Sequence, residues 1–555
     1  MRPELLGHLH PRVALSRTSL FVLLGVLVLA GLAFRVARIG AEGFSEDELN
    51  KLQAVEDYRA HGLTSANGEH PMLMKALLTL SLASAEEWDS LAPAASHPDS
   101  LRVSPEAALR FPSALFGALT CVLIYLVAAE LFGAEVGLIA AALWALDPAA
   151  IGLNRIAKED TFFLFFFLLA NFFWIRSQTI TEGHTGRSPE PYYWATGAAL
   201  GAMIASKYMP FFVAVSVSYN YAFQGLPNRR WQIGRPRYLR IFVFAFIIFL
   251  LCNPAILLPA TWREMSAFAS YKMVSHDGYE FMGTLYRHRL TDWLNGIPWY
   301  FYFVFTAFKL PPLTVAAFVT GLPQLFRRRT GDGRYFILFW LFFWVAAFVF
   351  AGGKFTRYFT TALPCVLIAA ALGVEVIGDW LARAFSLRSS AYARLALVAL
   401  VLVASAIASA ESVPHYRLYV NLFGGGPARA GDYFPHDEFY DAAVRDAMTE
   451  IARRARAGAR VASETPGLAA YYARRAGRDD LECVQLSDPA SLKKLEAGDF
   501  LIAARGRRYF SNDALLNALK QTPTPAFNVS LGQTKAIDVY TLDDATLQLL
   551  NGLTP

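Results

Sequence analysis

Two adjacent carboxylates, Asp47 and Glu48, follow the first long apolar run of the chain, within the stretch GFSEDEL at 43–49. On a turn these two side chains can face one site while Glu46 faces water. A carboxylate beside apolar surface has its pKa raised by desolvation, which suits a general base. A solvated charge run at a membrane surface is the plain alternative, and only the remaining charged segments can decide between the two.

Further charged residues recur where later apolar runs end. His70 and Lys75 lie in GEHPMLMK at 68–75, where Pro71 can open a helix from which Lys75 projects. A lysine at the edge of a membrane helix often only extends to water. The other groups of this kind are Arg110, Arg155 with Asp160, Lys207, and Lys354 with Arg357 and Tyr358. Outer connections usually disfavour cations, so their presence here favours a functional site.

The composition places these residues in a membrane protein. Hydrophobic residues make up 55% of the 555 residues and charged residues only 17%, against about 25% charged in a typical soluble protein. Disorder, fibrous repeats and a small disulfide scaffold are excluded. The net charge of +6 arises from 51 basic and 45 acidic residues. The basic excess lies in short loops between apolar runs, which indicates membrane topology and no nucleic-acid partner.

Apolar runs long enough to cross a bilayer, about 20 residues each, occur along most of the chain. We predict eleven spans, near 18–39, 107–132, 136–153, 161–176, 191–206, 208–225, 239–260, 299–326, 335–351, 358–378 and 394–412. Arginine and lysine are more frequent on the side of the N-terminus, which predicts a cytoplasmic N-terminus. An odd number of spans then places residues 413–555 outside the cytoplasm.

Two outer segments and the C-terminal part complete the predicted organisation. Residues 1–412 form the transmembrane part, with outer loops 40–106 and 261–298 that are longer than connectors need to be. Met72–Ala83 is predicted as a helix at the membrane interface, and Tyr279–Leu294 is also compatible with the membrane surface. Residues 413–555 alternate short strands, near 460–463, 482–486 and 499–504, with helices. This pattern predicts a small extracytoplasmic α/β domain, for which we favour an accessory role.

Four motifs in order resemble one known family. They are the acidic pair after the first span, HPxLxK in the same loop, LRxPSA at the second span, and NRxxxxD between the third and fourth. This set resembles the protein O-mannosyltransferase family and the wider GT-C superfamily of polyprenyl-phosphate-sugar-dependent glycosyltransferases, which includes the aminoarabinose transferases of lipid A. The resemblance covers residues 15–375. It implies a GT-C type polytopic α-helical membrane fold.

The resemblance also implies roles for residues. Asp47 matches the catalytic aspartate and Glu48 its acidic neighbour. The residues that would line the site and bind the lipid phosphate are His70, Lys75, Arg110, Arg155, Asp160, Lys207, Lys354, Arg357 and Tyr358. Two departures leave the acceptor open: the loop Thr261–Pro298 is too short for the β-trefoil of eukaryotic members, and the α/β tail lies outside the family pattern.

The implied reaction moves a sugar from a polyprenyl-phosphate-linked donor in the bilayer to an acceptor hydroxyl on the outer face, with inversion. Asp47 would be the general base, and cations would stabilise the leaving phosphate. No cofactor is expected to be required, although Asp47, Glu48 and Asp160 keep a divalent cation open. The acceptor can be Ser/Thr of exported proteins, lipid A, a cell-wall glycan or another lipid-linked sugar.

Location and rival functions follow from the same features. The Ala/Arg-rich composition and the short later loop indicate a bacterial plasma membrane. A multi-span transporter or flippase is the main alternative, but transporters usually place charges near the middle of the bilayer, whereas here they lie at outer helix ends. A membrane sensor is a third reading that leaves Asp47, Glu48 and the HPxLxK loop unexplained.

Overall fold

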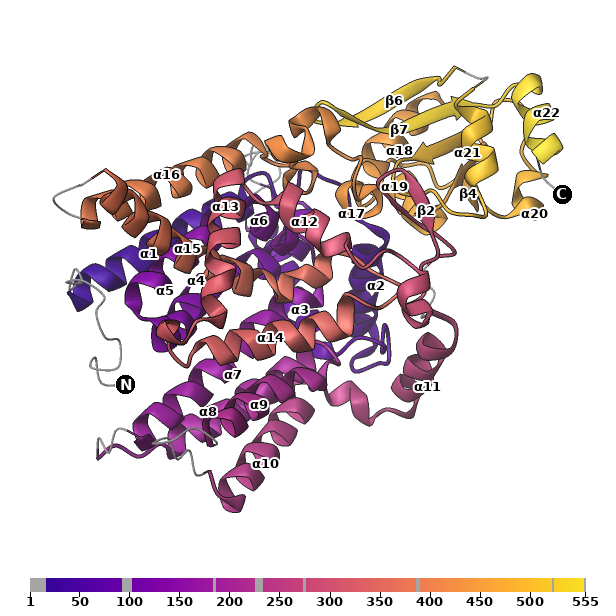
Figure 1. The fold of residues 1–555 in the computed structure, drawn as a ribbon. Coiled ribbons are helices and arrows are strands. Elements are labelled where there is room, and N and C mark those ends of the chain that lie inside the picture. Colours follow the sequence, from indigo (N-terminus) through magenta and orange to yellow (C-terminus); the bar gives the residue numbers. More distant parts are fainter. Residues whose placement is uncertain are drawn as a thin grey trace.

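The computed structural model describes residues 16–91, 102–182, 186–224, 233–272, 276–385, 390–521 and 524–553. Helices form a large body, and a sheet flanked by short helices lies at one end of it, near the C-terminus (Figure 1). The last residue of the predicted span 208–225 lies outside the described ranges. Parts of the two predicted outer loops also lie outside them.

The helical body contains sixteen of the helices that the described ranges hold. They are α1 (Arg17–Val36), α2 (Glu46–His61), α3 (Met72–Ser90), α4 (Pro105–Phe132), α5 (Ala134–Leu146), α6 (Pro148–Asn154), α7 (Glu159–Glu182), α8 (Glu190–Ser206), α9 (Val213–Gln224), α10 (Arg235–Cys252), α11 (Pro259–Ala267), α12 (Phe301–Lys309), α13 (Pro312–Gly321), α14 (Arg334–Phe348), α15 (Leu363–Ala384) and α16 (Ser390–Glu411). A helix lies at each of the eleven predicted apolar runs. The fold is therefore helical, as predicted.

Fewer of these helices qualify as membrane spans by length and apolar composition. Within the described ranges, α1, α4, α7, α15 and α16 pass both criteria, and a sixth passes if α5 and α6, which are bent by 63°, count as one. The predicted run 299–326 is divided into α12, α13 and a 3₁₀ turn at Leu322–Phe326. Eleven spans therefore remain a prediction.

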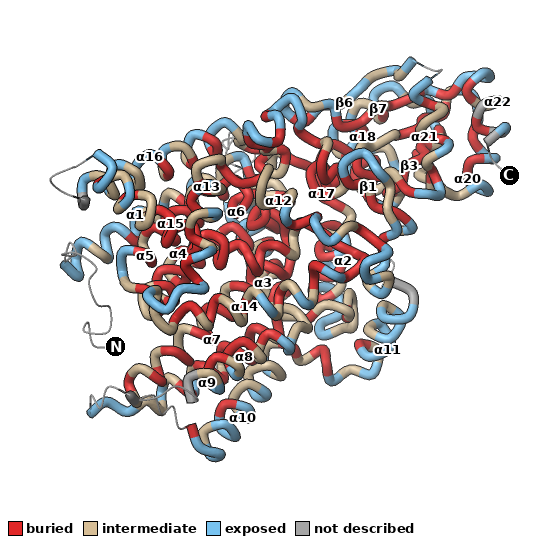
Figure 2. The backbone as a smooth tube through the Cα atoms, viewed as in Figure 1, coloured by how far each residue is buried: buried red, intermediate tan, exposed pale blue. Residues whose placement is uncertain are grey.

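Burial in the body fits a lipid environment. Aromatic residues fill its interior, for example Phe167 of α7 with its ring centroid 4.8 Å from that of Trp340 on α14. Large apolar side chains are instead exposed on peripheral helices, including Phe21 of α1, Phe242 of α10 and Leu395 of α16 (Figure 2). Soluble proteins rarely expose apolar surface on this scale, so these faces fit contact with acyl chains.

The described part of the first outer loop before residue 92 forms two helices joined by a turn. α2 begins with a capping box: the Ser45 side chain accepts from the Glu48 amide, and the Glu48 carboxylate accepts from the Ser45 amide. Such reciprocal bonds satisfy two free amides of the first helical turn. α3 follows Pro71 and contains the predicted helix 72–83, extended to Ser90. A position at the membrane interface stays a prediction.

The later outer loop contacts the C-terminal part. Its described part forms α11 and a hairpin of β1 (Tyr279–Phe281) and β2 (Thr284–Tyr286). Tyr279 and Phe281 are buried, and the Met282 amide donates to the Tyr433 carbonyl at 3.1 Å. The strands therefore pack against the C-terminal part, and a position of Tyr279–Leu294 at the membrane surface stays a prediction.

The C-terminal part contains a five-stranded sheet. Its strands are β3 (Arg460–Ser463), β4 (Glu482–Gln485), β5 (Phe500–Ala504), β6 (Phe527–Leu531) and β7 (Thr534–Thr541), in the order β4-β3-β5-β7-β6. β4, β3 and β5 are parallel, whereas β7 is antiparallel to β5 and β6. The helices are α17 (Pro435–Phe439), α18 (Val444–Arg454), α19 (Pro466–Arg475), α20 (Pro489–Leu492), α21 (Asp513–Leu519) and α22 (Asp544–Leu553). The three predicted strands are present, and β6 and β7 were not predicted.

Candidate active site

A polar cavity of about 380 Å³ lies where the outer loops meet the C-terminal part. Its wall comes from the first turns of α2, the loop before α3, the start of α7, the residue after α8, the segment 353–358, and residues 436–441 with Arg507. Of the residues predicted from the sequence, the cavity is lined by Asp47, His70, Asp160, Lys207, Arg357 and Tyr358. The fold thus brings together residues up to about three hundred positions apart.

Asp47 is the carboxylate at the centre of this cavity. Its Oδ2 lies 2.8 Å from Nζ of Lys158 and 3.8 Å from Nη2 of Arg357, and it accepts a hydrogen bond of 3.0 Å from the Tyr440 hydroxyl. The side chain keeps 37% of its surface exposed to the cavity. One oxygen therefore takes all three of these partners, and no partner of Oδ1 occurs among the residues that the structure describes, so Oδ1 can meet a ligand.

The electrostatics of Asp47 differ from the sequence expectation. Burial would raise the pKa of Asp47, but Lys158 and then Arg357 lower it well below its ordinary value. The expectation of a raised pKa is therefore wrong, because the sequence does not reveal that two cations share this carboxylate. Asp47 is ionised and ready to accept a proton, although it is a weak base while both cations stay on it.

A second charged cluster faces the same cavity. Glu159 Oε1 lies 2.7 Å from Nζ of Lys51 and 3.3 Å from Nδ1 of His70, and Asp160 Oδ1 lies 2.6 Å from Nζ of Lys207. Burial, together with the nearby lysines, holds the pKa of His70 well below its usual range although Glu159 opposes the shift. This environment favours the neutral form of the His70 imidazole, and its predicted contact with the lipid phosphate stays a prediction.

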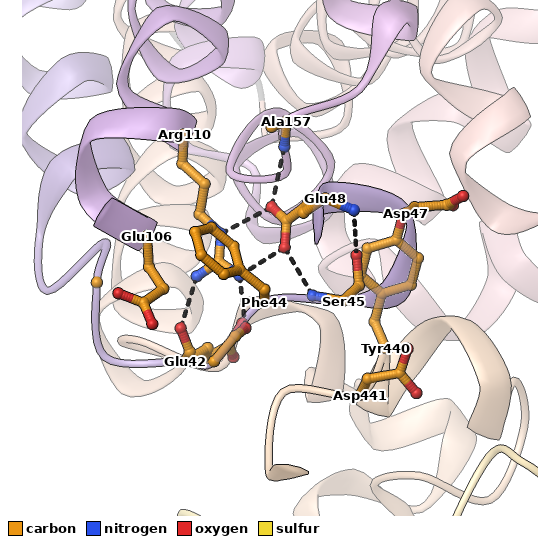
Figure 3. Close-up of polar contacts among 12 residues, drawn as sticks. Glu42, Phe44, Ser45, Asp47, Glu48, Glu106, Arg110, Ala157, Tyr440 and Asp441 are labelled. Carbon is orange, nitrogen blue, oxygen red and sulfur yellow. Dashed lines mark hydrogen bonds and ion pairs between the residues drawn. The ribbon is translucent and has the colours of Figure 1, made fainter. Parts of the chain in front are cut away.

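Glu48 points away from the cavity into a buried ion pair, shown in Figure 3. Its Oε1 accepts from Nε of Arg110 at 2.8 Å and from the Ala157 amide at 3.0 Å. Its Oε2 accepts from Nη2 of Arg110 at 2.7 Å and from the Ser45 amide at 3.0 Å. Both oxygens are engaged, and neither Glu48 nor Arg110 lines the cavity. Their roles in catalysis and at the lipid phosphate stay predictions. The pair fixes the turn that carries Asp47.

Three further predicted cations do not line the cavity. Nζ of Lys75 donates to three carbonyls of residues 66–70, and the guanidinium of Arg155 donates to four carbonyls of residues 34–38. Nζ of Lys354 donates to the carbonyls of Ile297 and Ala351. Buried carbonyls at helix ends and turns need donors, and these three side chains supply them. Their expected contact with phosphate stays a prediction.

Most residues that line the cavity were not predicted individually, and four of them stand out: Lys51, Lys158, Glu159 and Tyr440. Lys158 and Glu159 lie in the segment 154–160 quoted from the sequence, and Lys51 lies one helical turn after Asp47, so their spacing from predicted residues was an available signal. No sequence signal pointed to Tyr440. Its backbone, like that of Asp441, is in the left-handed region, with φ of 46° and 59°, where non-glycine residues are uncommon and often functional.

The described residues contain no group of three or more His, Cys, Asp or Glu side chains arranged to hold a metal ion. Asp47, Glu48 and Asp160, the set that the sequence left open, do not converge, because Arg110 holds both oxygens of Glu48. These three residues therefore do not fit a common metal site in this arrangement.

The buried pair gives a first testable expectation. Replacing Glu48 by Gln leaves the Arg110 guanidinium without a counter-charge, and removing one partner of a buried pair typically costs about 3–5 kcal/mol. We expect a lowered midpoint of thermal unfolding, with turnover per folded molecule close to wild type. Glu86→Gln is the matched control, because its pair with Arg59 is exposed and such pairs contribute little. An unchanged midpoint with lost turnover would assign Glu48 to the chemistry instead.

Comparison with known proteins is consistent with this geometry. The sequence profile of the family described as dolichyl-phosphate-mannose-protein mannosyltransferase matches residues 100–252. The fold is similar to that of ArnT from Cupriavidus metallidurans in the apo state, with a TM-score of 0.52 at 14% identity over 94% of this chain and 98% of that one. No curated protein matches the chain by sequence.

Two further solved structures match with lower TM-scores. ArnT bound to undecaprenyl phosphate gives a TM-score of 0.49 at 14% identity, with the same coverage of 94% and 98%. The archaeal oligosaccharyltransferase AglB from Archaeoglobus fulgidus, in complex with an inhibitory peptide and a dolichol-phosphate, gives 0.48 at 12% identity, covering 88% of this chain and 70% of that one. The profile match and the fold of apo ArnT confirm the resemblance to the GT-C glycosyltransferases.

Proposed function

We propose that the protein is a membrane glycosyltransferase that moves a sugar from a polyprenyl-phosphate-linked donor to an acceptor hydroxyl. The observation that carries this proposal is Asp47, a carboxylate with one free oxygen in a cavity of about 380 Å³ that it shares with Lys158, Lys207 and Arg357. The profile match to a dolichyl-phosphate-mannose-dependent family supports the donor class.

Asp47 acts as the general base in this mechanism. The acceptor hydroxyl donates its proton to the free Oδ1 while its oxygen attacks the anomeric carbon of the donor sugar. The bond from that carbon to the phosphate oxygen breaks on the opposite face, so the anomeric centre is inverted. The bonding electron pair leaves with the polyprenyl phosphate, and the proton stays on Asp47 until it passes to solvent.

Lys207 and Arg357 stabilise the leaving group. The phosphate gains about one negative charge as the sugar departs, and fixed cations in a site with little water are worth more than they are in bulk water. Nη1 of Arg357 is buried and has no hydrogen-bond partner among the described residues. Lys207 lies with Nζ 4.9 Å from the ring centroid of Tyr358. Unlike Lys75, Arg155 and Lys354, these two side chains are not held by several backbone carbonyls, so they can reach a phosphate.

The test of the function is mass spectrometry of lipids, glycans and exported proteins from cells with and without the gene. Loss of the gene should remove one sugar modification, which identifies the product, and should let one polyprenyl-phosphate sugar accumulate, which identifies the donor. A gene copy that carries Asp47→Asn should not bring the modification back and should not lower the accumulated donor. Identical lipid and glycan profiles in the two strains would contradict the proposal.

We also propose that the N-terminus is cytoplasmic, that the cavity and residues 413–555 face the outside, and that the membrane is a bacterial plasma membrane. Single cysteines at positions 65 and 511, in a background without the four native cysteines, should react with an impermeant reagent added outside intact cells. A cysteine at position 328, which is exposed shortly before α14, should react only after lysis. Labelling with the reverse pattern would invert the topology.

A further inference from the structure

A second cavity, of about 350 Å³, adjoins the first. Glu46 and His276 line both cavities, and Glu46 is the residue before Asp47 on the first turn of α2. Nη1 of Arg507 lies 3.2 Å from Oε2 of Glu46 at this junction. A molecule that places a hydroxyl at Asp47 can therefore extend past Glu46 into the second cavity.

The second cavity lies at the carboxyl ends of the parallel strands in the C-terminal sheet. Glu464 directly follows β3, Gln485 is the last residue of β4, and Tyr509 lies in the loop after β5. In the strand order β4-β3-β5, the next strand in sequence, β4, lies on one side of β3, and the following strand, β5, lies on its other side. Open α/β sheets bind ligands in the crevice at such a switch in strand order. We name this cavity the crevice.

The polar groups of the crevice are held in place by one another. Glu464 is buried, and its Oε1 accepts from Nδ2 of Asn512 at 2.7 Å. Its Oε2 accepts from the side-chain Nε2 of Gln485 and from the hydroxyl of Ser487 at 3.1 Å. The side chains are thus oriented before any ligand arrives, which reduces the entropy lost on binding.

The chemistry of the crevice favours a ligand rich in hydroxyl groups and without phosphate. Its carboxylates, on Glu46, Asp277 and Glu464, accept hydrogen bonds from hydroxyls and repel anions. The rings of His276 and Tyr509 are stacked, with centroids 4.4 Å apart, and give the junction an aromatic wall. Hydroxyl-binding polar groups beside an aromatic surface suit a sugar ring, which has polar edges and an apolar face.

We propose that the crevice binds the saccharide part of the acceptor, so that the C-terminal sheet selects a glycan or glycolipid whose hydroxyl reaches Asp47. This inference rests on the proposed transferase function. A volume of about 350 Å³ falls within the range of about 300–1,000 Å³ that is usual for ligand sites. This proposal assigns acceptor recognition to the part of the chain for which the sequence predicts an accessory role.

The test uses the purified full-length protein in nanodiscs with the donor lipid identified by the lipid analysis above. The envelope glycolipid and glycan fraction is offered as acceptor in one arm, and the exported protein fraction in the other. We expect the sugar to enter the protease-resistant glycolipid or glycan fraction. Ser511→Trp, which fills the crevice from an exposed position, should raise the KM for that acceptor about tenfold or more, with kcat within about twofold.

Two more variants separate this inference from a general structural effect. Glu464→Gln should raise the same KM, whereas Glu482→Gln should change nothing, because Glu482 is exposed at the opposite end of β4. Slow hydrolysis of the donor by water needs no acceptor, so it should be unchanged in all three variants. Sugar transfer into protein, or an unchanged KM in both crevice variants, overturns the proposal. Absence of both transfer and donor hydrolysis in the wild type would instead overturn the transferase function itself.

Discussion

Asp47→Asn should abolish sugar transfer while the protein stays folded and still binds its donor lipid. Asparagine has nearly the same shape and can still accept the hydrogen bond from Tyr440, but it cannot take a proton from the acceptor hydroxyl. Loss of a general base typically lowers the rate by about 10²–10⁴. Turnover of the purified variant, with donor binding and thermal unfolding measured in parallel, checks this expectation.

The control for this prediction lies on the same helix. Glu56 is exposed on α2 and does not line the cavity, so Glu56→Gln should keep wild-type turnover. If Asp47→Asn also keeps it, Asp47 is not the base. If the variant fails to bind the donor, Asp47 serves to place the cations instead.

The pH dependence of the rate offers a second view of Asp47. Lys158 and Arg357 lower the pKa of Asp47, so the carboxylate is ionised well into the acid range. Protonation of Asp47 should therefore not lower kcat/KM near pH 5. Lys158→Gln removes the larger of these effects, so the acid limb of kcat/KM should move to higher pH. An unmoved limb would show that another group sets it.

The helical part of the fold could be predicted from the sequence because apolar runs of bilayer length are a strong signal. The helices depart from the predicted runs where proline interrupts a run. The run 299–326 predicts one span, but Pro311 and Pro312 lack amide donors, so α12 ends at Lys309 and α13 begins at Pro312. Likewise Asp147 caps a new helix at Pro148, which divides the predicted span 136–153.

The site was predictable in part, since Asp47, His70, Asp160, Lys207, Arg357 and Tyr358 do line one cavity. The sequence could not show which cations face a ligand and which bind backbone carbonyls, because both kinds occur at helix ends. Arg155 and Lys158 are three residues apart, yet Arg155 binds carbonyls at the C-terminal end of α1 and Lys158 binds Asp47. Tyr440 reaches Asp47 from 393 positions away, and no local pattern announces such a contact.

Arg357 should be the cation whose loss lowers turnover most. Its guanidinium lies between Asp47 and Asp437, at 3.8 and 4.0 Å, with Nη1 free of hydrogen-bond partners among the described residues. Removing one preorganised donor to a developing charge typically costs about 10²–10³ in kcat. Arg357→Gln should therefore lower kcat to this extent while the KM for the acceptor changes little, because the charge that Arg357 meets is largest in the transition state.

A graded series of variants tests the chemistry of this contact. Arg357→Lys should recover only part of the lost kcat, because an ammonium is a point charge and cannot form the paired contacts of a guanidinium with phosphate oxygens. Arg287→Gln is the matched control, since Arg287 is exposed in the neighbouring hairpin region and does not line the cavity. Turnover of the wild type should also survive EDTA if Lys207 and Arg357 neutralise the leaving phosphate. The opposite result would be a complete loss of turnover in EDTA that Mg²⁺ or Mn²⁺ reverses, together with near-normal turnover of Arg357→Gln. It would show that a metal ion, and not these side chains, neutralises the leaving phosphate.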